Sequence, residues 1–123
     1  MAQDLDFSGS WHSKYHYTST AKEGRFTSEY DVKMYRTGNQ LVIQSLPNEN
    51  EDYILLRLSV DGRFLTGTWY EQTSPTGDYE GVSRYGALQL IVDEDGQAMH
   101  GKWVGFNRKM YVQGDDWEIV RTQ

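Results

Sequence analysis

The sequence contains no cysteine, and this absence limits what holds the fold together. Neither a disulfide framework nor a thiolate metal site is available, so the hydrophobic core must stabilise the chain alone. Proline is scarce, with two residues, whereas glycine is common, with twelve. Many glycines and few prolines are typical of tight turns between uninterrupted strands, which favours an all-β fold.

Long apolar runs and an excess of basic residues are also missing. No stretch approaches the roughly 18 apolar residues of a membrane-spanning helix, and residues 1–7 lack the basic and apolar segments of a secretory leader. We therefore expect a cytoplasmic protein, or a soluble domain of a longer one, with no membrane partner. The formal charge of -6 argues against binding to duplex nucleic acid, which depends on Lys and Arg neutralising phosphates.

The length of 123 residues suits a single domain spanning 1–123. Between its turn signals, the chain alternates polar and apolar residues with the period of two that half-buried strands show. The predicted strands cover 8–18, 25–36, 39–46, 52–60, 63–72, 79–92, 97–106 and 110–121. The turn signals are Thr37-Gly38-Asn39, Pro47 to Glu51, Asp61-Gly62, Ser74 to Gly77, Asp93 to Gly96 and a short turn near Asn107. For Asp61-Gly62 we predict a type I′ hairpin turn, with positive φ at both residues.

No window shows a sustained helical repeat of apolar residues, and the short connections imply an up-and-down meander. Closing the meander removes two exposed sheet edges, and eight strands leave an interior that holds side chains or one small ligand. We predict an all-β fold: a single closed eight-stranded antiparallel up-and-down β-barrel.

A repeat within the chain supports this fold. The segment Asp61 to Trp69 recurs as Asp95 to Trp103, each ending in Gly-x-Trp, and Gly9-Ser10-Trp11 is a shorter copy. Glycine and tryptophan two apart share one strand face, so each glycine is predicted to make room beside an inward indole. The alternative is a stacking cage for a ligand, formed by Trp11, Trp69 and Trp103.

These tryptophans set the inward phase of the strands. The residues predicted inside are Gly9, Trp11, Ser13, Tyr15 and Tyr17; Phe26, Ser28, Tyr30, Val32 and Met34; Ile54, Leu56, Leu58 and Val60; Leu65, Gly67, Trp69 and Glu71; and Arg84, Gly86, Leu88, Leu90 and Val92. One barrel end is then apolar, whereas the other, the mouth, gathers Ser13, Tyr15, Tyr17, Ser28, Tyr30, Ser45, Glu71 and Arg84. Because a buried guanidinium needs a partner, Arg84 either pairs with Glu71 or receives an anionic ligand.

The sequence does not place residues suited to catalysis or metal binding close to one another. His12 and His16 lie on the predicted outer face about 13 Å apart, and His100 is also predicted outward. The segment Asp93 to Gly96 lacks the spacing of a calcium loop. No base-activated nucleophile is evident, so we expect no enzyme activity, no metal and no cofactor. Arg108 is a second cation, which together with Arg84 would suit a phosphate group.

Short motifs across nearly the whole chain resemble a known family. They are Leu5 to Trp11, Tyr70 to Pro75, Tyr85 to Leu90, Met99 to Trp103 and Arg108, and they resemble the minimal β-barrel of two-transmembrane-helix effectors in CBASS antiphage defence. The segments Gly67 to Gly77 and Gly101 to Phe106 also look like barrel domains of actinobacterial helix-turn-helix regulators. Avidin-like and lipocalin-like barrels share the Gly-x-Trp start. The resemblance implies a sensor of cyclic oligonucleotides, with Tyr70 and Arg108 at its site.

We expect a sensor or receptor barrel for a small molecule, with a cyclic nucleotide or similar anion as the first candidate. The predicted ligand-binding residues are Tyr15, Tyr17, Tyr30, Tyr70, Glu71, Arg84 and Arg108. One alternative is a carrier of a neutral apolar or aromatic ligand. Another is a homo-oligomer that associates through outer aromatic residues such as Tyr35, Tyr53 and Phe64.

Overall fold

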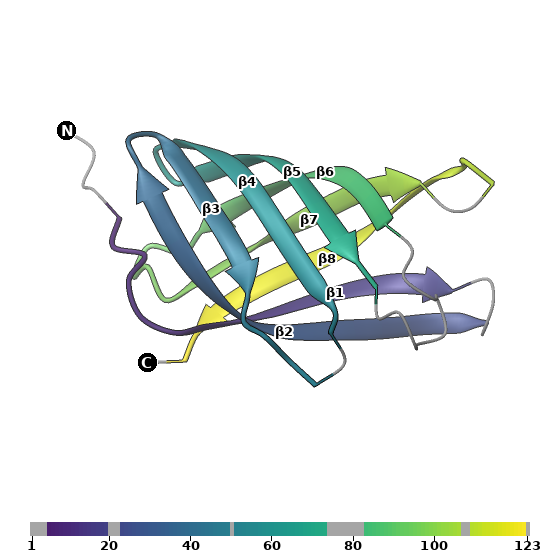
Figure 1. The fold of residues 1–123 in the computed structure, drawn as a ribbon. Coiled ribbons are helices and arrows are strands. Elements are labelled where there is room, and N and C mark those ends of the chain that lie inside the picture. Colours follow the sequence, from purple (N-terminus) through teal and green to yellow (C-terminus); the bar gives the residue numbers. More distant parts are fainter. Residues whose placement is uncertain (1–4, 20–22, 50, 74–82, 107–108, 123) are drawn as a thin grey trace.

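The computed structural model describes residues 5–19, 23–49, 51–73, 83–106 and 109–122, and confirms a closed antiparallel barrel (Figure 1). Each strand pairs with its neighbours in the sequence, and β8 pairs with β1. The strands are β1 (Trp11–Ser19), β2 (Gly24–Thr37), β3 (Gln40–Ser45), β4 (Tyr53–Asp61), β5 (Phe64–Gln72), β6 (Ser83–Val92), β7 (Ala98–Phe106) and β8 (Val112–Arg121). The residues predicted at 79–82, the start of the sixth strand, lie outside the described ranges. Within those ranges, no helix is long and apolar enough to span a membrane.

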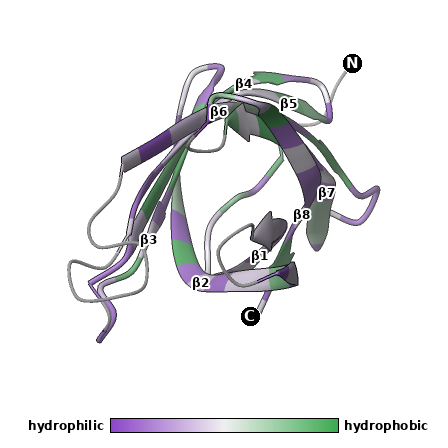
Figure 2. Ribbon diagram, turned by 90° about the vertical axis from the view of Figure 1, so that its right-hand side faces the viewer, coloured by the Kyte–Doolittle hydropathy of each residue, from purple (hydrophilic) through white to green (hydrophobic). Residues whose placement is uncertain are grey.

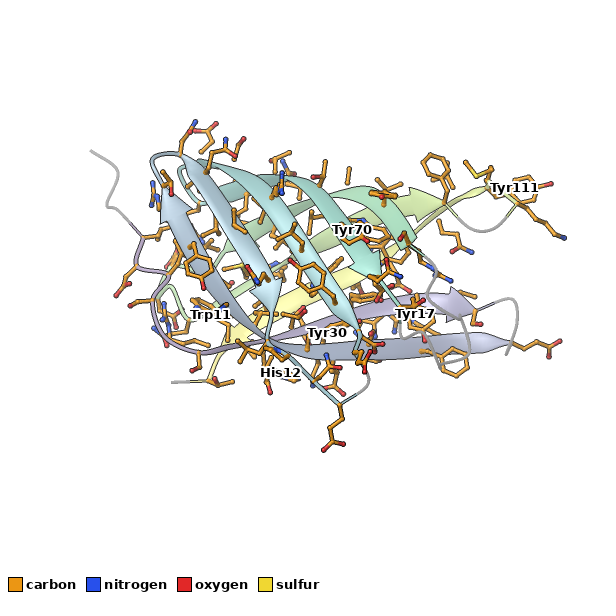
Figure 3. The ribbon with its side chains drawn as sticks, in the orientation of Figure 1. Trp11, His12, Tyr17, Tyr30, Tyr70 and Tyr111 are labelled. Carbon is orange, nitrogen blue, oxygen red and sulfur yellow. The ribbon has the colours of Figure 1, made fainter. Side chains whose placement is uncertain are left out.

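The two barrel ends differ, as predicted. At the closed end, where β1 begins and β8 ends, the interior is filled by aliphatic side chains and Trp11 (Figure 3). Those with no more than 1% exposure include Leu41, Ile43, Leu56, Leu58, Leu65, Leu90, Val92, Met99 and Ile119. The mouth is the opposite end, where β1 finishes at Ser19 and β6 begins at Ser83. Figure 2 looks toward the mouth along the barrel.

The residues before Trp11 cover the closed end and do not extend β1, which corrects the predicted start at residue 8 and the inward position of Gly9. Gly9 has a φ of 95°, which strands do not adopt, and the turn places Phe7 in the core. The Trp11 indole donates to the Phe7 carbonyl at 3.0 Å. The Arg121 guanidinium lies 4.2 Å from the centre of the Trp11 ring, which fixes the other side of this indole.

The β4–β5 hairpin is confirmed, but its predicted turn type is wrong. Asp61 pairs with Phe64, so the two turn residues are Gly62 and Arg63. Gly62 has a φ of 60°, while Arg63 does not have a positive φ. This combination belongs to a type II′ turn, because glycine occupies the first central position.

The repeated glycines also act differently from the prediction. A Cβ on Gly67 would lie 1.8 Å from the Arg57 carbonyl oxygen, and one on Gly101 would lie 1.8 Å from that of Gln89. The two glycines therefore allow close approach to the backbone of the preceding strand, β4 or β6, and do not make room for the tryptophan that follows them. The 34-residue spacing reflects two equivalent strand contacts.

The barrel is incompletely paired at its mouth. β1 pairs with β2 as far as Ser19, but with β8 only from Trp11 to Tyr15. Residues 16–19 of β1 and 112–116 of β8 do not pair with each other, and the β1–β2 and β7–β8 hairpins diverge there (Figure 1). We call this stretch without backbone pairing the seam. Arg25 of β2 reaches across it to Asp115, with Nε and Nη2 donating at 3.1 and 2.8 Å.

This bidentate pair is expected to stabilise the seam in a pH-dependent way. The hydrogen bond from Arg25 lowers the pKa of Asp115 from 3.8 to about 2. The contribution is therefore present above pH 3.8 and is lost as the pH falls through about 2. We expect Arg25→Gln to lower the free energy of unfolding only slightly at neutral pH, since more than half of the Arg25 side chain is exposed and solvent screens the pair. Urea unfolding across this pH range measures the loss.

A matched control is Lys102→Gln, which removes the exposed Lys102–Asp116 pair between the adjacent strands β7 and β8. It should cost less than Arg25→Gln. Equal costs for the two variants, or a cost for Arg25→Gln that stays constant below pH 3.8, would contradict a stabilising link across the seam.

Candidate ligand-binding site

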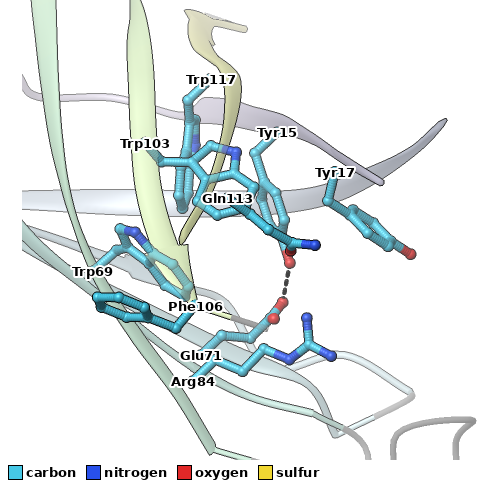
Figure 4. Close-up of a pocket in the computed structure, with 9 residues that line it drawn as sticks. All are labelled: Tyr15, Tyr17, Trp69, Glu71, Arg84, Trp103, Phe106, Gln113 and Trp117. Atoms are coloured by element: carbon cyan, nitrogen blue, oxygen red, sulfur yellow. Dashed lines mark hydrogen bonds between the residues drawn. The ribbon is translucent and has the colours of Figure 1, made fainter. Parts of the chain in front are cut away.

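The inner wall of the mouth is lined mainly by aromatic rings (Figure 4). The lining residues are Tyr15, Tyr17, Trp69, Glu71, Arg84, Trp103, Phe106, Gln113 and Trp117. Trp69 and Trp103 meet edge to face with ring centres 5.5 Å apart, and Tyr15 lies 4.7 Å from Trp117. Such ring contacts stabilise the fold beyond the effect of burying the rings. Because these rings also contact one another around the mouth, we call them the aromatic wall.

Three indoles of this wall are fixed by hydrogen bonds. Trp69 donates to the Val104 carbonyl at 3.1 Å, Trp103 to the His16 carbonyl at 2.8 Å, and Trp117 to Ser13 Oγ at 2.8 Å. Of the three tryptophans in the alternative of a stacking cage, Trp11 does not belong to this wall, because it is buried at the closed end. Trp117 contributes to the wall instead, and the alternation that buries Trp117 and Ile119 in β8 is the signal that identifies it.

Glu71 is the buried carboxylate of this end, with 6% of its surface exposed. Its Oε2 accepts hydrogen bonds from the hydroxyls of Tyr15 and Tyr30, the latter at 3.0 Å. Burial and the Glu71 charge raise the pKa of both tyrosines, so both hydroxyls remain protonated donors. Oε1 has no donor among the described residues and keeps some solvent contact. This oxygen is therefore available to a donor entering the mouth.

Burial raises the pKa of Glu71, opposed by the two tyrosine hydrogen bonds and by the positive charge of Arg84. Arg84 lies directly opposite Glu71 in the β5–β6 ladder, on the inner face where both were predicted. Arg84 has a partner within the protein. The mouth pocket is thus lined by an acidic and a basic residue on neighbouring strands, Glu71 on β5 and Arg84 on β6.

The free space inside the mouth is small, about 10 Å³, which is close to the minimum that holds one water molecule. Phe106, which is 53% exposed, and the half-buried Arg84 and Gln113 lie around it. A larger ligand therefore has to move these three side chains outward. The seam borders the same space, since Tyr17 and Gln113 come from its two strands.

The structure brings together most, but not all, of the predicted site. Tyr15, Tyr17, Glu71 and Arg84 line the pocket, and Tyr30 supports it through Glu71. Tyr70 points to the outer face of β5, since it alternates with the inward Trp69 and Glu71. Arg108 lies outside the described residues. Phe106, Gln113 and Trp117 were not predicted at the site, and Trp69 and Trp103 were named only in the alternative of a stacking cage.

The histidines do not form a metal site. His12 lies outward, as predicted, but it is not simply solvated, because Asp31 and Glu29 contact its two ring nitrogens at 2.8 and 2.9 Å. The hydrogen bond to Glu29, followed by that to Asp31, raises the pKa of His12. The two carboxylates lie on opposite sides of the ring, and the described ranges contain no group of three or more His, Cys, Asp or Glu residues suited to a metal ion.

Searches against known protein families, curated proteins and solved structures found no match to this chain. The fold and the site define a small closed antiparallel barrel with an aromatic mouth around a buried carboxylate. The closed barrel is consistent with the minimal barrel that the sequence motifs suggest.

Proposed function

We propose that this protein is a small-molecule-binding barrel whose ligand enters the mouth and donates an N–H or O–H group to Oε1 of Glu71. The observation that carries this proposal is the buried carboxylate itself. Burying an ionised carboxyl is unfavourable unless its hydrogen-bonding capacity is satisfied, and the described residues satisfy only Oε2. A barrel that served only as a scaffold would gain stability from an apolar residue at this position.

The aromatic wall suggests the shape of the ligand. Trp69, Trp103 and Trp117 have fixed indoles, so a flat ring system gains stacking contact without ordering these side chains. The finer proposal is a sensor of a cyclic oligonucleotide or similar anion, in line with the resemblance to the CBASS receptors. In that arrangement a base would occupy the wall beside Glu71, and a phosphate would lie at the rim beside Arg84.

The test combines a thermal-shift screen of cyclic di- and trinucleotides with native mass spectrometry of the freshly purified protein. A ligand at 100 times its Kd should stabilise the protein by about 2.7 kcal/mol. Glu71→Gln should abolish the shift for any mouth ligand, whereas Arg84→Ala should reduce it for an anionic ligand. A retained neutral molecule whose binding is indifferent to Arg84→Ala would favour a carrier. The absence of both a thermal shift and a retained molecule would refute the proposal.

A further inference from the structure

The outer face of β4, β5 and β6 carries a slot that is distinct from the mouth. Its walls and floor are formed by Leu55, Arg57, Thr68, Tyr70, Tyr85 and Gly86, together with part of Trp69. Its volume is about 370 Å³, compared with about 10 Å³ of free space inside the mouth. Small-molecule pockets usually have volumes from about 300 Å³ upward, so the slot accepts a ring-sized group without rearrangement.

Two tyrosines give the slot its aromatic character. The ring centres of Tyr70 and Tyr85 are 5.1 Å apart, and Tyr53 lies beyond Tyr70 at 6.4 Å. The Tyr70 hydroxyl donates to Gln72 Oε1 at 2.8 Å, which holds its ring in place. Tyr85 is 66% exposed. Covering an exposed aromatic ring is favourable, because its apolar surface is then removed from water. The slot therefore combines a fixed ring with one that a ligand would cover.

Arg57 supplies the charge at this slot. It projects outward from β4 opposite Thr68, and within the described residues its guanidinium forms no hydrogen bond or ion pair. The chain has 18 acidic and 12 basic residues, yet none of the described carboxylates pairs with Arg57. Guanidinium groups bind carboxylates and phosphates through paired hydrogen bonds, so the free group favours an anion.

We propose that this outer slot binds an aromatic anion, with a flat ring against Tyr70 and Tyr85 and a carboxylate or phosphate on Arg57. The aromatic ring and the anionic group belong to the same small molecule, because Tyr70, Tyr85 and Arg57 line one slot. The outward position of Tyr70 gives this residue a ligand contact that it cannot make in the mouth. The proposal is independent of ligand binding at Glu71, which faces the other side of β5.

The test is an NMR titration of the ¹⁵N-labelled protein with indole-3-acetate and with adenosine 5′-monophosphate, which distinguish a carboxylate from a phosphate source. The amide signals of Thr68, Tyr70 and Tyr85 should shift in a saturable way with at least one of them. The uncharged analogues indole-3-acetamide and adenosine should bind more weakly. Arg57→Gln should weaken binding about fivefold, and Tyr85→Ala about tenfold.

The control is Lys33→Gln, which removes a cation 5.5 Å from the exposed ring of Tyr35 on β2 and should leave binding unchanged. Four results would overturn the proposal. They are no saturable shift with either anion, equal affinity of the wild type and Arg57→Gln, shifts centred on Glu71 and Gln113 that Glu71→Gln removes, and slot shifts that depend on protein concentration alone. The last result would assign this face to a second copy of the chain.

Discussion

Gly101→Ala is expected to destabilise the barrel by about 3 kcal/mol or more, a large effect for the addition of one methyl group. The new Cβ would lie 1.8 Å from the Gln89 carbonyl oxygen and 2.9 Å from Leu90 Cα. Both are backbone atoms of β6, which pairs directly with β7 at Leu90 and Gly101. No side chain can rotate away, so the strands must separate and lose ladder hydrogen bonds. Urea unfolding of the purified variant measures the cost.

Two further variants show whether the cause is the close strand contact. Gly67→Ala should be equally damaging, because its Cβ would meet the Arg57 carbonyl oxygen at the same 1.8 Å. Gly96→Ala should cost only about 1–2 kcal/mol, since Gly96 has open space around it and a φ of 72°, so that only backbone strain arises. A Gly101→Ala protein as stable as Gly96→Ala would show that β6 and β7 can separate locally, contrary to our account.

Glu71→Gln is expected to do two opposite things: abolish ligand binding in the mouth and stabilise the unliganded protein. The amide oxygen retains the hydrogen bonds from Tyr15 and Tyr30, while the amide nitrogen presents a donor where the ligand needs an acceptor. Removing the buried charge should raise the free energy of unfolding at neutral pH by about 1–2 kcal/mol. Ligand titration and urea unfolding on the same preparation measure both effects.

The stability gain should depend on pH in a defined direction. Burial raises the pKa of Glu71 above its ordinary value of 4.5, so the folded protein retains this proton at pH values where the unfolded chain has released it. The wild type is therefore most stable, as far as this group is concerned, below pH 4.5 and loses stability as the pH rises through the folded-state pKa. The advantage of Glu71→Gln should accordingly vanish below pH 4.5.

Glu118→Gln is the matched control, because Glu118 lies on the exposed face of β8. It should change stability by less than about 0.5 kcal/mol and leave binding intact. A destabilised Glu71→Gln protein would indicate that the carboxylate is needed to hold Tyr15 and Tyr30 in place. That result would remove the main argument for a ligand at Oε1.

The fold was predictable because its signals are local. Alternation along each strand and tight turns such as Gly62 define antiparallel neighbours, and eight of them close without edges. The inward phase set by Trp69 also placed Glu71 and Arg84 on the inner face, and the ladder brings them opposite each other. These inferences need only the period of two and the order of the strands.

The details of the site depend on contacts that no local pattern contains. Tyr15 and Tyr30 meet Glu71 across the barrel interior, from strands 56 and 41 residues away in sequence. The sequence placed all three inside but could not show that one carboxylate oxygen takes both hydroxyls. Tyr70 was assigned through the resemblance, which carries no strand phase. The alternation with Trp69 and Glu71 shows that Tyr70 faces outward.

The incomplete β1–β8 pairing gives the barrel a direction in which it opens. β1 and β8 are hydrogen-bonded to each other near the closed end but not near the mouth. The two strands should therefore separate first at the mouth, because fewer backbone hydrogen bonds must break there. Amide protons of β1 and β8 near the mouth should then exchange with solvent through partial opening, whereas those near Trp11 and Ile119 exchange only on global unfolding. A molecule too large for the present space could enter by this partial opening, at a free-energy cost well below that of unfolding the domain.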